Sequence, residues 1–170
     1  RYAQWITKQE GVENETLDIK GLEFQKANFP PLLGKFFNDV LVDVLKGEKQ
    51  DNIDARVKIF KKQVLDGTIP LTDLGNPTSV KQIGKHQGKP ARYNDLLRFW
   101  KLDNKHELIT NGTKVKWIYL KSNPYHIEEI AFLDYAMPEK INTFIEQYAD
   151  RKKVFESILL NKLEGFYSDL

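Results

Sequence analysis

Apolar residues recur at helical spacing along much of the chain. Between residues 32 and 46 they form a wide stripe at Leu32, Leu33, Phe36, Phe37, Val40, Leu41, Val44 and Leu45. Residues three and four apart share a helix face, so this stripe predicts an amphipathic helix with neighbours on more than one side. Pro31 suits the first turn of this helix because its missing N–H costs nothing there.

A second helix is predicted from a cap at Asp51 to about Leu65. Its expected inward residues are Ile53, Val57, Phe60 and Val64, and its expected outward residues are Lys58, Lys61 and Lys62. Gly47 and Gly67 close the two helices, because glycine readily adopts the left-handed conformation at a helix end. Together the two helices form a helical hairpin. Further helices are expected over residues 91–102, 139–148 and 151–167, the last with a buried stripe of Val154, Ile158, Leu159, Leu163 and Phe166.

Alternation of apolar and polar residues predicts the strands. Residues 1–7 and 18–26 form an expected antiparallel pair, and the alternation of the second strand slips at Gly21. Asn111-Gly112 is the strongest hairpin signal, because it supplies the positive φ angles of a tight turn. Strands are expected after it at residues 115–120 and 130–133. Residues 75–79 are expected to form a turn in which Thr78 or Ser79 caps a short helix.

These elements predict an α+β fold that is predominantly helical. We expect an N-terminal antiparallel strand pair, a helical region with a small β-hairpin insertion, and C-terminal helices. Residues 16–31 run from a strand through the stiff Pro30-Pro31 corner into a helix, so they form a joint between two structural units.

Composition narrows the class of protein. Hydrophobic and charged fractions of 41% and 29% are typical of a globular chain rather than a disordered one. No apolar run approaches the roughly 18 residues that a bilayer span needs, so a membrane partner is not expected. The chain has no cysteine, which excludes disulfides and thiol chemistry and favours an intracellular protein.

Charge is unevenly distributed along the chain. The stretch from Arg56 to Lys105 holds eleven basic and four acidic residues, while the whole chain has a net charge of only +2. This asymmetry suggests either a basic face toward a polyanion or a solvated surface. Within it, Lys81, Lys85 and Lys89 alternate with small polar residues whose backbone N–H groups could approach phosphates. Arg92 begins the helix expected over residues 91–102, and a helix N-terminus attracts phosphate.

No pattern of titratable residues predicts a catalytic centre. His86, His106 and His126 are far apart in the sequence and do not follow metal-ligand spacing. Glu128 and Glu129 are adjacent and would face opposite ways in a strand. The chain also lacks a phosphate-cradling glycine loop, a nucleophile elbow and a paired-aspartate metal motif. By itself the chain is not expected to be an enzyme.

Several motifs resemble the C-terminal region of bacteriophage DNA polymerases of family B. Arg1-Tyr2-Ala3, then Lys20-Gly21-Leu22-Glu23, then Pro30-Pro31 is similar to the segment that follows the catalytic motifs of that family. The resemblance continues through Gly75-Asn76-Pro77-Thr78-Ser79-Val80-Lys81, Gly88-Lys89-Pro90-Ala91-Arg92-Tyr93-Asn94 and Gly112-Thr113-Lys114-Val115-Lys116-Trp117-Ile118-Tyr119-Leu120. Many relatives carry Arg-Arg-Asp where this chain has Gln25-Lys26-Ala27, so only Lys26 keeps part of that role.

The resemblance implies that residues 1–29 are the C-terminal edge of a palm subdomain and residues 30–170 a thumb, which grips the primer–template duplex during DNA replication. Tyr2 would lie near the minor-groove side of the duplex. Lys20 and Gly21 would lie close to the primer backbone, where a side chain at Gly21 would block the approach. The full set of expected DNA-binding residues is Arg1, Tyr2, Lys20, Gly21, Lys26, Lys81, Lys85, Lys89 and Arg92.

The resemblance also places the chemistry outside this chain. The metal-binding aspartates, the nucleotide-binding lysine and the exonuclease carboxylates of such polymerases would all precede Arg1. A parent polymerase would use two Mg²⁺ bound elsewhere, so we expect no cofactor here and no extension of DNA by this fragment. The expected partners are duplex DNA, the rest of the polymerase chain and, through a tail at Phe166-Tyr167, a sliding clamp. The expected location is the cytoplasm of an infected bacterial host.

Two other functions remain open at this point. One is a stand-alone nucleic-acid-binding module without a polymerase parent. The other is a protein-interaction domain in which residues 151–170 dock a partner, and for which Lys81, Lys85, Lys89 and Arg92 would be indifferent to DNA. For the tail at Phe166-Tyr167, packing into the core is the favoured alternative to clamp binding.

Overall fold

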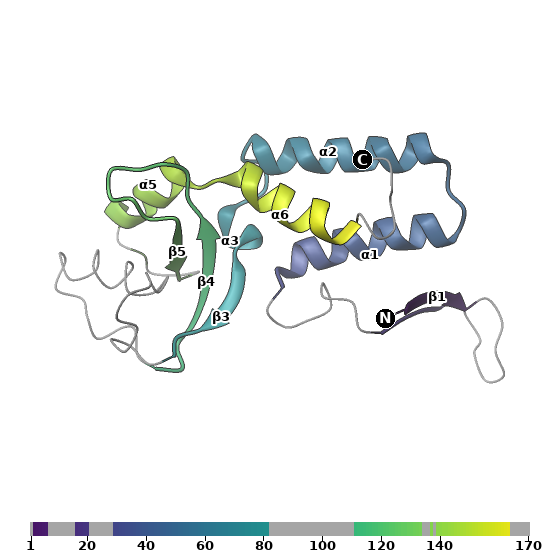
Figure 1. Cartoon of the computed structure of the whole chain (residues 1–170), viewed down its shortest axis with the longest axis horizontal. Coiled ribbons are helices and arrows are strands. Elements are labelled where there is room, and N and C mark those ends of the chain that lie inside the picture. Colours follow the sequence, from purple (N-terminus) through teal and green to yellow (C-terminus); the bar gives the residue numbers. More distant parts are fainter. Residues whose placement is uncertain are drawn as a thin grey trace. The chain divides into compact units, whose positions relative to one another are not determined.

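The chain folds into two compact units, residues 1–68 and 69–170, which are described separately. The computed structural model describes residues 2–6, 16–20, 29–81, 111–133, 137 and 139–163 (Figure 1). Within these residues the helices include more residues than the strands do, and every strand pairing is antiparallel. The expected α+β, predominantly helical fold is therefore confirmed.

The first unit opens with a strand pair. β1 (Tyr2–Ile6) and β2 (Thr16–Lys20) pair antiparallel, with Ile6 opposite Thr16 and Tyr2 opposite Lys20. The expected pairing is confirmed, although β2 begins two residues earlier than the sequence pattern suggested. The alternation slip at Gly21 and the rest of residues 21–28 lie outside the described residues.

The proline corner starts α1 (Pro31–Leu45) as expected. Pro30 has φ −58° and ψ 124°, which is extended, and Pro31 is the first helical residue. The carbonyl oxygen of Pro30 accepts a hydrogen bond from the Gly34 N–H at 2.9 Å. Because the fixed φ of proline suits this position and its missing N–H leaves no donor unsatisfied, the corner costs the helix nothing.

The helical hairpin of α1 and α2 (Gln50–Leu65) holds the core of the first unit. The stacked rings of Phe36 and Phe60 join the helices, with centroids 3.9 Å apart. The predicted inward residues of α2 are buried and its three predicted outward lysines are exposed, so this helix was predicted correctly. The stripe of α1 is narrower than expected, because Leu32 and Val44 are only half-buried and Leu45 is exposed.

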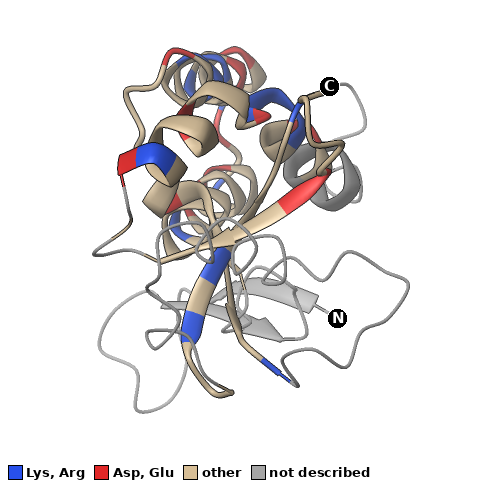
Figure 2. Cartoon of the chain, turned by 90° about the vertical axis from the view of Figure 1, so that its left-hand side faces the viewer, with Lys and Arg blue, Asp and Glu red and all other residues tan. Residues whose placement is uncertain are grey.

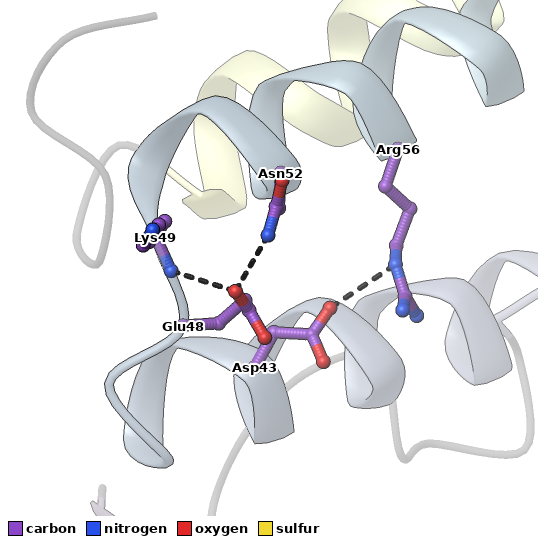
Figure 3. A network of polar contacts seen from close by, with 5 residues as sticks. All are labelled: Asp43, Glu48, Lys49, Asn52 and Arg56. Atoms are coloured by element: carbon purple, nitrogen blue, oxygen red, sulfur yellow. Dashed lines mark hydrogen bonds and ion pairs between the residues drawn. The ribbon is translucent and has the colours of Figure 1, made fainter.

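The turn between the helices corrects one expectation. Asp51 is not the cap of α2; Lys49 occupies that position, and Asp51 lies in the first turn. The Glu48 carboxylate instead accepts hydrogen bonds from the Lys49 N–H at 2.9 Å and from the Asn52 amide at 2.7 Å (Figure 3). A carboxylate beside a helix N-terminus accepts hydrogen bonds from groups that have no partner within the helix. Its negative charge also interacts favourably with the helix dipole.

Glycine and an ion pair complete the hairpin. Gly47 ends α1 with φ 73° and Gly67 follows α2 with φ 86°, so both predicted glycine stops are confirmed. The Arg56 Nε of α2 lies 3.1 Å from the Asp43 Oδ2 of α1 (Figure 3). This pair fixes the register of the two helices near their connection.

The second unit is built on a three-stranded antiparallel sheet with the order β3–β4–β5. After the short α3 (Leu71–Leu74) come β3 (Asn76–Ser79), β4 (Lys114–Tyr119) and β5 (Glu129–Phe132), which confirms the last two strands. Five fully buried residues mark the core of this unit. Ile118 and Ile130 come from β4 and β5, and Val80 directly follows β3. Leu74 comes from α3 and Val154 from α6.

The described residues of the second unit also form two longer helices, α5 (Glu139–Tyr148) and α6 (Arg151–Leu163), as expected. Their junction extends the sheet, because the Asp150 N–H donates to the Tyr119 carbonyl and the Lys121 N–H donates to the Tyr148 carbonyl. The side chains of Ile158, Leu159 and Leu163, and residues 164–170, lie outside the described part. Among the described residues, no helix is both long and apolar enough to cross a bilayer.

The expected turn and helix cap at Thr78 and Ser79 are wrong. These residues belong to β3 and pair with Val115 and Lys114 of β4. Pairing with β4 overrides the local preference of these residues for a turn. Pro77 is tolerated because β3 is an edge strand of the described sheet. Gly112 has the expected positive φ, 93°, whereas the strand expected before Asn111 and the helix expected over 91–102 fall outside the described residues.

The hydrogen-bonded carboxylate of Glu48 should make the free energy of unfolding depend on pH. Its hydrogen bond from the Lys49 N–H, then that from Asn52 and the charge of Arg56, hold the pKa of the Glu48 carboxyl below its ordinary value of 4.5. A lowered pKa in the folded state stabilises the fold above about pH 4.5, and this stabilisation is lost as the pH falls through the lowered pKa. We predict that Glu48→Gln lowers the free energy of unfolding at pH 7 and has a shrinking effect below pH 4.5, as measured by urea unfolding.

The matched control for net charge is Glu128→Gln, which removes an exposed carboxylate of the other unit. A deficit of Glu48→Gln that stays constant from pH 7 to pH 3 would contradict the assignment of Glu48 as a charged cap.

Candidate nucleic-acid interface

The register of the first strand pair brings two expected DNA contacts together. Tyr2, the first residue of β1, lies directly opposite Lys20, the last residue of β2. Directly opposed residues of an antiparallel pair have Cα atoms only about 4.5 to 5.5 Å apart. Two motifs that are separate in the sequence therefore meet at one end of the ladder. Arg1 and Gly21 are the next residues in the chain beyond that end, and they lie outside the described part.

The second group of expected contacts starts at the sheet of the second unit. Lys81 follows β3 and is exposed, and Lys114 begins β4 and is also exposed. Since Ser79 is the register partner of Lys114, both lysines lie at the same end of the β3–β4 pair. Lys and Arg positions, among them those of β4, are drawn in blue in Figure 2. Lys114 was missed as a candidate, although it stands two residues after the Asn111-Gly112 turn signal.

Backbone hydrogen bonds close this end of the sheet. The Val80 N–H donates to the Thr113 carbonyl, and the Gly112 N–H donates to the Val80 carbonyl, both at 2.9 Å. The chain therefore leaves the sheet at Lys81 and returns to the same place at Asn111. The residues between, 82–110, include the expected contacts Lys85, Lys89 and Arg92, which lie outside the described residues.

Lys116 is a structural lysine rather than a candidate for binding. It is half-buried, and its Nζ donates to the Thr72 carbonyl of α3 at 2.6 Å. Its register partner is Phe132, and both flank Gly75, where an added Cβ would lie 2.8 Å from Lys116 Cβ and 2.7 Å from Phe132 Cζ. Lys114 and Lys116 are thus two residues apart on β4, but only Lys114 is exposed.

The basic stretch of the sequence is divided between the two units. Arg56, Lys58, Lys61 and Lys62 lie on α2 of the first unit, whereas Lys81 and the residues after it belong to the second. Neither unit by itself carries the whole basic stretch that the charge count singled out. The correction at β3 also changes how phosphates could be bound there, because residues 76–79 are a paired strand and not a loop of free backbone N–H groups.

No three His, Cys, Asp or Glu side chains in the described part of the chain gather so that they could hold a metal ion. His126 is exposed on the connection between β4 and β5, while His86 and His106 fall outside the description. What the arrangement can do is bind a polyanion through lysines held at the ends of two ladders. Among the other expected contacts, Lys26 also lies outside the described residues.

No protein-family model matches the chain, and no curated protein matches it. The resemblance to family-B polymerases therefore depends on the motifs quoted above and on their order in the chain.

The different environments of Lys114 and Lys116 yield a prediction for stability. Lys116→Ala leaves the Thr72 carbonyl without its charged donor, so it should lower the free energy of unfolding by about 1.5 to 3 kcal/mol. Lys114→Ala is the matched control and should change it by no more than about 0.5 kcal/mol, because Lys114 is exposed. Urea unfolding of both variants measures the difference. Equal effects would show that the Lys116–Thr72 contact does not stabilise the sheet.

Proposed function

We propose that this chain is the C-terminal thumb region of a family-B DNA-directed DNA polymerase, which grips the primer–template duplex during replication. The observation that carries the proposal is the register of β1 and β2. The resemblance assigns Tyr2 and Lys20 to the duplex on the basis of two separate motifs, and the ladder places these residues directly opposite each other. A common binding surface requires this proximity, and neither motif alone implies it.

The arrangement beyond the strand pair supports the same function. The Pro30-Pro31 corner leads directly into the α1–α2 hairpin, as the junction of a palm edge with a helical thumb requires. In the second unit, the closed end of the β3–β4 pair would hold Lys81 and Lys114 as phosphate contacts and anchor the segment that carries Lys85, Lys89 and Arg92. Contacts with phosphates position a duplex without reading its sequence, which suits a polymerase that must hold any template.

The chain would bind DNA and leave catalysis to residues that precede it. The two Mg²⁺ of such a polymerase need a cluster of carboxylates. The described residues do not form one, so no catalytic step is assigned to them. In this proposal the rest of the polymerase chain is the permanent partner, a sliding clamp binds through the tail at Phe166-Tyr167, and the protein works in the cytoplasm of an infected bacterium.

Salt-dependent DNA binding tests the proposal. We predict that the chain binds a fluorescent primer–template duplex with an affinity that falls steeply between 50 and 200 mM NaCl, at about 0.9 decades per decade of salt for each phosphate contact. Lys81/Lys85/Lys89→Ala should reduce that slope by about 2.7, because three contacts are removed. Fluorescence anisotropy at several salt concentrations gives both the affinity and the slope.

The control variant is Lys58/Lys61/Lys62→Ala, which removes the same charge from the exposed face of α2. It should reduce the slope clearly less than the first variant. If the first variant binds the duplex as the unaltered chain does, or if both variants lose the same amount, the thumb proposal fails. A loss shared by both would show that DNA responds only to net charge.

A further inference from the structure

The β3–β4 ladder ends in a bulge at Gly112. The Val80 N–H donates to the Thr113 carbonyl, and the Gly112 N–H donates to the Val80 carbonyl, so two residues of one side stand opposite one residue of the other. Gly112 is the first residue of the bulge and has φ 93°, a left-handed conformation that residues with a side chain rarely adopt. The end of the ladder therefore favours glycine at this position.

This glycine makes the preceding residue chemically reactive. Asparagine is one of the thermolabile residues of proteins, because the backbone nitrogen of the next residue can attack its side-chain carbonyl. Asn111 and Gly112 form the only Asn-Gly pair of the sequence, and both are exposed. Gly112 has no side chain to hinder the attack, and apart from its chain neighbours no atom lies within 4 Å of the place a Cβ would take. Every other asparagine precedes a residue with a side chain.

One hydrogen bond restrains this reaction in the folded chain. To attack Asn111, the Gly112 nitrogen must give up its proton and approach the side-chain carbonyl, yet its N–H is bonded to the Val80 carbonyl at 2.9 Å. The reaction therefore requires the end of the ladder to open. Exposed hydrogen bonds at the end of an element open at a lower free energy than the whole fold, so this opening does not need global unfolding.

We propose that Asn111 is a site of spontaneous deamidation that the opening of this ladder end controls. The Gly112 nitrogen forms a bond to Asn111 Cγ and closes a succinimide ring. The bond from Cγ to Nδ2 breaks, and ammonia leaves with the proton of the Gly112 nitrogen. Water then opens the ring at either of its two carbonyls. The product is aspartate or isoaspartate, and each carries a carboxylate where the chain had a neutral amide.

The new carboxylate appears beside candidate phosphate contacts. Lys81 directly follows Val80, the residue bonded to Gly112, and Lys114 stands three residues after Asn111. Both lysines are exposed. A negative charge here attracts the lysines and repels phosphates. Isoaspartate also adds an atom to the main chain before Gly112, which moves its N–H away from the Val80 carbonyl. Deamidation thus weakens DNA binding, a consequence that rests on the function proposed above, whereas the reaction itself does not.

Peptide mapping of the intact chain by mass spectrometry tests the reaction. At neutral pH, the peptide with Asn111 should gain the mass of an amide-to-carboxyl change at least about tenfold faster than the peptide with Asn142. Asn142 is the matched control, because it is exposed but lies within α5 and precedes Thr143. Urea that unfolds the chain should speed the change at Asn111 by at least about tenfold, since the bond to Val80 is lost. Asn111→Gln should abolish the mass gain of its peptide.

Two results of this experiment would overturn the proposal. Equal rates at Asn111 and Asn142 in the folded chain would show that Asn111 is not a special site. Equal rates at Asn111 with and without urea would show that the ladder end does not control the reaction.

Substitution by aspartate tests the consequence for DNA. Asn111→Asp should weaken binding of the primer–template duplex about threefold at low salt, and Asn142→Asp, which adds the same charge to α5 of the same unit, should leave it within about 1.5-fold. Circular dichroism checks that both variants remain folded. Equal effects of the two variants would overturn the link between deamidation and DNA. A chain that deamidates at Asn111 but binds no duplex would uphold the site and refute the proposed function.

Discussion

The antiparallel pairing of β3 with β4 is the constraint on which the second unit depends. It joins residues that are far apart in the sequence, with Val80 bonded to Thr113 at the end where the chain leaves the sheet and Asn76 opposite Trp117 at the other end. β4 is hydrogen-bonded to three neighbours: β3 on one side, β5 on the other, and the junction of α5 and α6 at its end. Lys116 of β4 donates to the Thr72 carbonyl of α3, while Lys114, two residues earlier on the same strand, stays exposed.

The first unit depends on a different interaction, the aromatic and ionic contacts between α1 and α2. The stacked Phe36 and Phe60 join the middle of the hairpin, and the Asp43–Arg56 pair and the Glu48 cap hold its connection. These contacts leave one face of α2 with exposed charge and an exposed isoleucine. Both units carry candidate DNA contacts at strand ends: Tyr2 and Lys20 in the first unit, and Lys81 and Lys114 in the second.

Local patterns predicted the helices well because helix formation depends on nearby residues. The inward residues of α2 and the glycine stops at Gly47 and Gly67 needed no knowledge of distant contacts. β3 could not be predicted in this way, since Asn76-Pro77-Thr78-Ser79 has turn residues throughout and becomes a strand only because β4 pairs with it. The contact of Glu48 at the start of α2 was missed for a related reason: Glu48 reaches the N–H of the cap residue Lys49 through the path of the connection, whereas Asp51 only had a suitable residue type.

The candidate site was predicted in part. Tyr2 and Lys20 came from the resemblance, and only the register showed that they are neighbours. Lys114 was missed and Lys116 was not distinguished from it, because the two have the same residue type and their exposure is decided by a carbonyl of α3.

Hydrogen exchange with and without a primer–template duplex tests the central claim most directly, because it locates the DNA on the chain. The account predicts slower amide exchange on DNA binding at the Tyr2–Lys20 end of the first strand pair and from Lys81 to Thr113, with little change along α2. Protection confined to α2, or no protection at the strand ends, would contradict it.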